Sequence, residues 1–258
     1  MTEDKRPQGP LWRYFGGKWR ARKTYPEPRY QTIVEPFAGA ASYSLWHGRG
    51  RDIILADASP HIRAIWLSVT QPGAADRIRA LPDLQRGVDV RTQSSDPGLA
   101  CLMGSWCNDA SAGQRWRPTE WALLGQRRCT WNIKARDRCA DVVDAWRPAH
   151  VSVLDDWRSC PDIEATWFID PPYIAQGHHY THGSEGIDYD DLADWCMSRR
   201  GQVIVCEAEG ADWLPFRPHA RVQAMMSSRG KRFISEVIWT NDPACVATKQ
   251  IGYPHERP

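Results

Sequence analysis

Short apolar runs that end at or beside an acidic residue alternate along this chain with stretches of helical character. The runs lie at 31–37, 52–57, 150–154, 166–170 and 203–207. Helices are expected at 40–48, 57–69, 133–147 and 188–199, and two later strands at 219–226 and 234–239. Strands that alternate with helices in this way form a mostly parallel sheet covered by helices on both faces. We therefore predict an α/β fold with a doubly wound sheet.

The alternation is interrupted between residues 71 and 132, where Gly, Pro, Gln, Ser and Arg are frequent and no periodicity is visible. We interpret this stretch, together with the helix that follows it, as an inserted segment of residues 71–147. Residues 1–70 and 148–258 are then expected to form one domain. A chain of 258 residues with 42% hydrophobic residues can bury a sizeable core, which excludes an intrinsically disordered protein.

We expect neither a membrane protein nor a secreted one. No apolar run approaches the roughly 20 residues that a membrane-spanning helix needs, and the N-terminal sequence MTEDKRPQGP contains no apolar signal. A cytoplasmic protein is expected, with its eight cysteines as reduced thiols. No metal site is expected, because no cysteine pair has CxxC spacing. His178, His179 and His182 are irregularly spaced, and we interpret them as part of a mobile loop over the substrate rather than as metal ligands.

Basic residues gather in two parts of the chain, although the net charge is only +2. Residues 5–30 contain eight of them against one acid, and residues 113–138 contain seven against two. Cations that alternate with aromatic residues are typical of nucleic-acid surfaces, whereas a solvated surface is the simpler interpretation. The alternating aromatic residues are Trp12, Trp19, Trp116, Trp121 and Trp131. The candidate nucleic-acid contacts in the inserted segment are Arg115, Arg117, Arg127, Arg128 and Lys134. Such arginines either read guanine edges or hold phosphates, and the sequence favours neither.

Every predicted parallel strand ends beside a carboxylate. These are Glu35, Asp57, the doublet Asp155–Asp156, Asp170 and Glu207. Ligands of open α/β sheets bind beyond the carboxyl ends of the strands, so we expect a polar ligand with several donors there. Capping of the next helix is the alternative role, and for Glu207 it is as plausible as a substrate contact.

The turn at Gly39 favours a nucleoside cofactor over a dinucleotide. It does not match GxGxxG, and no GxxxxGK[ST] motif occurs anywhere in the chain. Asp57 follows Gly39 by eighteen residues, which is where such sheets carry the acceptor for ribose hydroxyls. A ribose without a diphosphate indicates a nucleoside.

The sequence Asp170-Pro171-Pro172-Tyr173 carries the chemistry. Two prolines fix the backbone and remove two donors, so the turn holds a carboxylate, a carbonyl and an aromatic ring in fixed relation. An exocyclic amine on a planar base needs such a set: Asp170 and the Pro171 carbonyl accept its two hydrogens, and Tyr173 stacks on the ring. The alternative is a rigid surface loop whose aspartate caps a turn.

Four motifs occur in one order: Tyr14-Phe15-Gly16-Gly17-Lys18, then Glu35-Pro36-Phe37-Ala38-Gly39-Ala40-Ala41-Ser42, then Leu55-Ala56-Asp57, then Asp170-Pro171-Pro172-Tyr173. This order resembles the Dam-type DNA adenine-N6 methyltransferases of bacteria and phages, which contain DPPY and depend on S-adenosyl-L-methionine. The resemblance covers most of the chain except about 71–147. It implies a Rossmann-like class I methyltransferase sheet with an inserted target-recognition segment, and methylation of an adenine that has been flipped out of DNA.

The resemblance also assigns roles to matching positions. It implies catalytic roles for Asp170, Pro171, Pro172 and Tyr173. It implies cofactor contacts for Tyr14, Lys18, Glu35, Phe37, Gly39, Asp57 and one of Asp155 and Asp156, which the doublet leaves unresolved. One position departs from the family, which commonly has GAGS where this chain has Gly39-Ala40-Ala41-Ser42. If residue 41 needs a positive φ, alanine costs about 1 kcal/mol there, and if it is helical, alanine is harmless.

The expected partner is double-stranded DNA, bound by a monomer in a bacterium or a phage-infected host, with a cognate restriction endonuclease as a candidate partner of a restriction-modification system. Two other functions stay open. One is methyl transfer to an amine on RNA, and the other is a catalytically silent DNA-binding module of the same fold.

Overall fold

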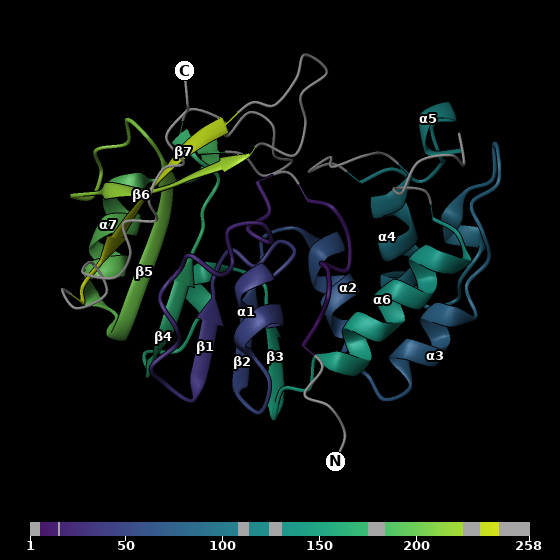
Figure 1. Ribbon diagram of the computed structural model, residues 1–258, viewed down its shortest axis with the longest axis horizontal. Helices are drawn as coiled ribbons and strands as arrows, with labels where there is room; N and C mark the ends of the chain where they lie inside the picture. The colour runs from purple at the N-terminus through teal and green to yellow at the C-terminus, as the bar shows by residue number, and fades with distance from the viewer. Residues whose placement is uncertain are drawn as a thin grey trace, which may run out of the picture.

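The computed structural model describes residues 6–14, 16–107, 114–123, 131–174, 184–223 and 233–242. These residues form a seven-stranded sheet in the order β3-β2-β1-β4-β5-β7-β6 (Figure 1). The strands are β1 (Thr32–Glu35), β2 (Asp52–Ala56), β3 (His150–Leu154), β4 (Glu164–Ile169), β5 (Arg200–Ala208), β6 (Arg217–Gln223) and β7 (Phe233–Thr240). Strands β1 to β5 are mutually parallel, and β7 is antiparallel to both β5 and β6. The order 3-2-1-4-5 of the parallel strands is that of the Rossmann fold, so the predicted mostly parallel sheet is confirmed.

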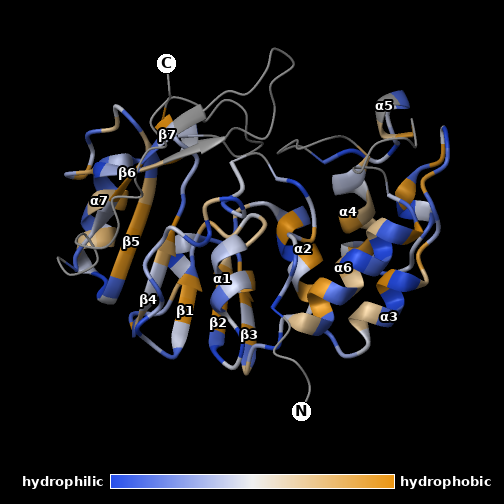
Figure 2. Cartoon of the chain, in the orientation of Figure 1, coloured by the Kyte–Doolittle hydropathy of each residue, from blue (hydrophilic) through white to orange (hydrophobic). Residues whose placement is uncertain are grey.

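Side chains alternate between two hydrophobic clusters, one on each face of the sheet. Ile33, Phe168 and Ile204 belong to one cluster, whereas their neighbours Val34 and Trp167 belong to the other. This alternation follows from the two-residue period of a strand, and burial on both faces explains the nearly continuous apolar sequence of the central strands. Figure 2 shows the resulting hydrophobic colour along β5.

Helices cover both faces, as a doubly wound sheet requires. The described helices are α1 (Ser42–His47), α2 (Pro60–Val69), α3 (Ala74–Arg79), α4 (Pro97–Trp106), α5 (Glu120–Leu123), α6 (Ile133–Ala145) and α7 (Tyr189–Ser198). Residues of α1, α2, α4 and α6 share the first cluster with the sheet, and α7 packs in the second. Helix α2 begins three residues later than expected, because Asp57, Ala58 and Ser59 form the loop that leads into it.

The segment 71–132 contains helices that its sequence did not indicate. Helix α4 is buried on nearly every side, so it lacks the polar face that makes a helix visible as a periodic pattern. Its start carries an ordinary signal, since the Asp96 carboxylate accepts hydrogen bonds from the N–H groups of Gly98 and Leu99, at 2.9 and 3.1 Å. Helix α4 packs against α2, so the segment shares the main hydrophobic cluster. The boundaries at 70/71 and 147/148 stay a prediction.

Several tryptophans belong to the core instead of a nucleic-acid surface. Trp12 and Trp131 are each 1% exposed, so their interpretation as surface aromatic residues was wrong. Trp12 packs against Trp66 with ring centroids 5.6 Å apart, and Trp131 packs against Trp106 at the same separation. Tryptophan rings bury a large apolar area, so their use in the core explains part of the high tryptophan content of the chain.

Within the described residues, no helix is long and apolar enough to cross a membrane. In the same part of the chain no group of three or more His, Cys, Asp or Glu side chains is arranged to hold a metal ion. The described cysteines are free and buried. His178, His179 and His182 lie outside the described residues.

Candidate functional site

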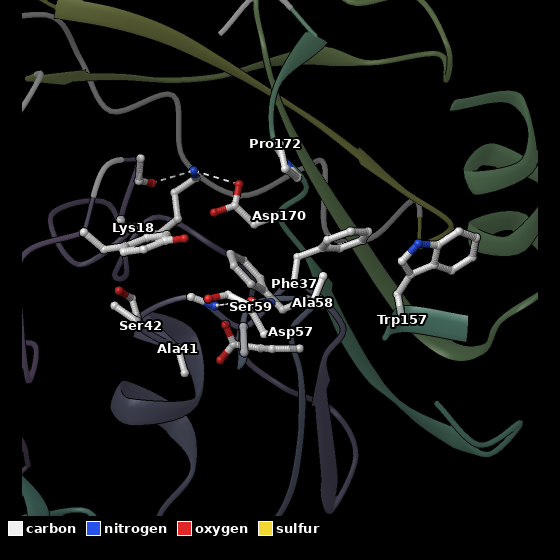
Figure 3. A pocket seen from close by; sticks show the side chains of 18 of the residues that line it. Lys18, Phe37, Ala41, Ser42, Asp57, Ala58, Ser59, Trp157, Asp170 and Pro172 are labelled. Carbon is white, nitrogen blue, oxygen red and sulfur yellow. Dashed lines mark hydrogen bonds and ion pairs between the residues drawn. The ribbon is translucent and has the colours of Figure 1, made fainter. Parts of the chain in front are cut away.

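The strand order reverses at β1, which has β2 on one side and β4 on the other. From β1 the chain proceeds outward through β2 to β3, then returns to β4 on the opposite side. The turns that follow β1 and β4 therefore diverge and leave a crevice, which is where open α/β sheets bind ligands. A cavity of about 360 Å³ lies at this point (Figure 3). Its size is within the range of small-molecule sites.

Most of the predicted site residues line this one cavity. They are Tyr14, Lys18, Glu35, Phe37, Gly39, Asp57, Asp156, Asp170 and Pro172. Of the doublet, Asp156 lines the cavity, whereas Asp155 is absent from the lining and accepts a hydrogen bond from the Ser159 hydroxyl at 2.8 Å. Residues as far apart in the sequence as Tyr14 and Pro172 are thus brought together by the sheet topology.

The turn after β1 has a conformation that only glycine adopts readily. Gly39 has a φ of +44°, and a Cβ there would lie 3.0 Å from the ring of Tyr14. The Asp57 carboxylate at the end of β2 accepts the N–H of Gly39 and the N–H of Ser59, each at 2.8 Å. The Gly39 carbonyl in turn accepts the indole N–H of Trp66 at 2.9 Å. These bonds fix the turn and Asp57 as one unit of the cavity wall.

Ala41 adopts the strained conformation that the sequence left as one of two alternatives. Its φ is 41° and its ψ 50°, and it is the one non-glycine among the described residues with a positive φ. It is also the N-cap of α1 and lines the cavity, without a side-chain cap. The alanine at this position therefore carries a conformational cost.

Glu35 has a structural role that the sequence did not reveal. Its carboxyl is 3% exposed and accepts the backbone N–H of Ser44 at 2.6 Å, which ties the end of β1 to the first turn of α1. Burial raises the pKa of Glu35 to about 8, against the opposing effect of the hydrogen bonds from Ser44. The group therefore carries a proton over most of the neutral range.

Asp170 follows β4 and pairs with Lys18 of the N-terminal segment. The Lys18 ammonium lies 2.7 Å from Asp170 Oδ1 and donates to the Gly16 carbonyl at 2.9 Å (Figure 3). Burial raises the pKa of Asp170 to about 6, although the nearby Lys18 lowers it. The ion pair links the motif at residues 14–18 directly to the double-proline turn.

The rest of the double-proline turn is fixed by contacts with Lys18, Tyr189 and Glu207. Tyr173 is 6% exposed and does not line the cavity, and the Lys18 ammonium lies 4.7 Å over its ring. The Pro172 carbonyl accepts the hydroxyl of Tyr189, and the Glu207 carboxylate accepts the N–H of Ile174 at 3.1 Å. Glu207 thus braces the turn from within the protein.

The predicted DNA contacts are only partly described. Arg115, Arg117 and Lys134 are exposed, the first two in the loop before α5 and the third at the start of α6. Arg127 and Arg128 lie outside the described residues.

Sequence reasoning missed residues that close the site from other directions. Trp157, directly after Asp156, lines the cavity and faces Phe37 with ring centroids 6.3 Å apart. Glu236 of β7 lies behind Asp170, with its Oε1 atom 3.8 Å from the Lys18 ammonium. The sequence did contain a signal for Glu236, because it is the acid within the mostly apolar run 233–240. Carboxylates are seldom buried without a partner, so an acid in such a run indicates a buried ion pair.

No protein-family model matches the chain, and no curated protein matches its sequence. Among solved structures, the chain is similar to the rRNA methyltransferase aviRa from Streptomyces viridochromogenes. The two are 12% identical over 85% of this chain and 81% of that chain, with a TM-score of 0.36. A likeness this weak supports no functional assignment.

Proposed function

We propose that the protein is an S-adenosyl-L-methionine-dependent methyltransferase that acts on the exocyclic amine of adenine in DNA. One observation carries the proposal: the four motifs of the sequence meet at a single cavity where the strand order reverses. Gly39, Asp57 and Asp156 form one part of its wall, and Asp170 and Pro172 form another.

The residues at the cavity fit the cofactor. Asp57 is held rigidly and suits the ribose hydroxyls, and Asp156 suits the adenine amine. The glycine turn leaves open a space that a Cβ at position 39 would fill, against the ring of Tyr14. Phe37 and Trp157 add apolar walls for a planar ring. When bound, the cofactor supplies an electrophilic methyl group on a sulfonium.

The double-proline turn supplies the acceptors for the target amine. In the proposed complex the Asp170 carboxylate and the Pro171 carbonyl receive its two hydrogens, so the nitrogen lone pair is directed away from them. Alignment of reacting atoms of this kind accounts for several kcal/mol of a barrier. Because the pKa of Asp170 is about 6, the carboxylate is ionised and a competent acceptor above that pH.

The target base must leave the duplex to reach this cavity, at a cost of a few kcal/mol. Stacking on Tyr173 is worth roughly 1–3 kcal/mol, and it requires the ring, which does not line the cavity, to become accessible to the base. The exposed cations Arg115, Arg117 and Lys134 support binding of a polyanion outside the cavity. The choice of DNA over RNA rests on the resemblance to Dam-type enzymes.

The test uses labelled cofactor with mixed-sequence duplex DNA, and methylated adenines are located by sequencing. The wild-type protein is expected to label DNA. Asp170→Ala should lose transfer while its cofactor affinity, measured by calorimetry, stays within a few-fold of wild type. Asp155→Ala is the matched control, because this acid lies just outside the cavity.

Three outcomes contradict parts of the proposal. Full turnover by Asp170→Ala removes Asp170 from the reaction. Labelling of structured RNA without labelling of duplex DNA replaces the substrate. Absence of cofactor binding by the wild-type protein overturns the assignment as an enzyme.

A further inference from the structure

One cation in the cavity wall, that of Lys18, lies between two carboxylates. The Lys18 ammonium is 5% exposed and lies 2.7 Å from Asp170 Oδ1 and 3.8 Å from Glu236 Oε1. The first distance is that of a close ion pair, and the second lies near the upper limit for one. Lys18 therefore pairs closely with Asp170 and only loosely with Glu236.

Glu236 is held in place by a contact that does not involve Lys18. Its Oε2 atom accepts the hydroxyl of Tyr25 at 2.7 Å, and this pair is buried. Tyr25 stacks on His219 with ring centroids 4.9 Å apart and planes 17° apart, and the His219 Nε2 atom lies 3.0 Å from the Thr24 hydroxyl. Strand β6 and the N-terminal segment thus fix the glutamate from one side, and its other oxygen faces Lys18.

The ion pair conflicts with the proposed reaction. The target amine needs Asp170 as an acceptor, and Lys18 occupies its Oδ1 atom, which leaves Oδ2 for the amine. Lys18 also lies 4.7 Å over the Tyr173 ring. A buried ammonium that leaves one carboxylate is strongly destabilised unless another anion receives it. Among the described residues, Glu236 is the second carboxylate within ion-pair distance of Lys18.

We propose that Glu236 is a positioning residue, which receives Lys18 from Asp170 when the target amine binds. This inference rests on the proposed function. The ammonium needs only a short movement to reach Glu236 Oε1, and its charge stays balanced throughout. The movement frees Asp170 Oδ1, so Lys18 holds this acceptor until a base is present.

The charges of Glu236 and Lys18 act in opposite directions on the pKa of Asp170, which can be measured. Negative charge on Glu236 raises the pKa of Asp170, in addition to the larger effect of burial, and Lys18 lowers it. The titratable groups that act on Asp170 from the surrounding elements are Lys18, Tyr25, Glu35, Tyr173, Cys206, Glu207 and Glu236. Removal of the Glu236 charge alone should therefore lower the pKa of Asp170 and leave Lys18 bound to it.

The test compares Glu236→Gln, which keeps an acceptor for Tyr25 but removes the charge, with Tyr25→Phe and Glu236→Asp, which keep the charge. Methyl transfer to duplex DNA is measured across pH, and cofactor affinity by calorimetry. Glu236→Gln should reduce kcat/KM for DNA about tenfold or more with unchanged cofactor affinity. The acid limb of its kcat/KM profile against pH should move to lower pH. The two charge-retaining variants should keep the wild-type limb and lose less kcat/KM.

A carbon-13 titration of the Asp170 carboxyl without substrate separates this inference from the proposed function. A wild-type protein that transfers no methyl group removes the function, and the inference with it. If the wild type transfers methyl groups but Glu236→Gln leaves the Asp170 titration and kcat/KM unchanged, the role of Glu236 is rejected and the proposed function stands. If Glu236→Gln does not fold, Glu236→Asp decides. Its shorter side chain should lower kcat/KM with a wild-type acid limb, and wild-type kcat/KM overturns the inference.

Discussion

Among single residues, Ala41 in the cavity wall has a backbone conformation that is unfavourable for a residue with a side chain. Ala41 has a φ of 41°, which brings the Cβ of an L-residue too close to its own backbone. Glycine removes this contact but adds freedom to the unfolded chain. Ala41→Gly is expected to raise the free energy of unfolding by up to about 1 kcal/mol, measured by urea titration.

Ala40→Gly is the matched control, because Ala40 lines the same cavity without a positive φ. Glycine there adds freedom to the unfolded chain and removes a buried methyl group, so a loss of about 1–2 kcal/mol is expected. A loss in both variants would show that position 41 is not strained.

A second prediction at this scale concerns Glu35, whose pKa rises from 4.5 to about 8 on folding. The native state therefore holds a proton that the unfolded state has released between these values. Stability from this group is complete below about pH 4.5 and is lost as the pH rises towards 8. Glu35→Gln keeps an acceptor for the Ser44 N–H and cannot titrate.

Urea unfolding of the two proteins between pH 5 and 8 checks this. The stability of Glu35→Gln relative to wild type should rise with pH, by at most about 1.4 kcal/mol per pH unit. A constant difference across this range would mean that Glu35 titrates normally in the folded protein.

At the scale of elements, the strands were predictable and α4 was not. Each parallel strand is short, apolar and followed by an acid, and these features are local. Helix α4 has no polar face because α2 packs closely on it, and that neighbour is not visible in the sequence of α4 itself. The same limit applies to Glu236, whose role depends on β7 pairing antiparallel with β5.

The contact between α2 and α4 provides the prediction for this scale. A Cβ at Gly98 would lie 2.0 Å from the Ala64 carbonyl oxygen and 2.1 Å from the Ser68 hydroxyl. Gly98→Ala must push the helices apart, and we expect it to lower the free energy of unfolding by about 1–3 kcal/mol in urea titration. Gly9→Ala is the control, since its Cβ would meet only Arg138 Cδ at 3.8 Å. Equal stability of Gly98→Ala and wild type would contradict the close approach.

At the scale of the whole molecule, the candidate cavity was predictable and the nucleic-acid surface was not. The acids and turns of the cavity are placed by the strand order, which follows from the alternation of strands and helices. Surface charges have no such constraint, and the tryptophans that suggested an interface at residues 12 and 131 are buried. Only the folded chain distinguishes a tryptophan that packs in the core from one that faces a partner.

The exposed cations Arg115 and Arg117 can be tested directly for contacts with DNA phosphates. If Arg115 and Arg117 contact phosphates, each neutralises one and releases its counterions, so the slope of log K against log salt is −0.9 per contact in duplex DNA. Arg115→Ala combined with Arg117→Ala should make the slope less negative by about 2, measured by fluorescence anisotropy across sodium chloride concentrations. Arg86→Ala is the control, because Arg86 is also exposed but is already paired with Glu120 at 2.6 Å. A weaker affinity with an unchanged slope would exclude phosphate contacts, and a loss confined to guanine-containing sites would assign these arginines to base recognition.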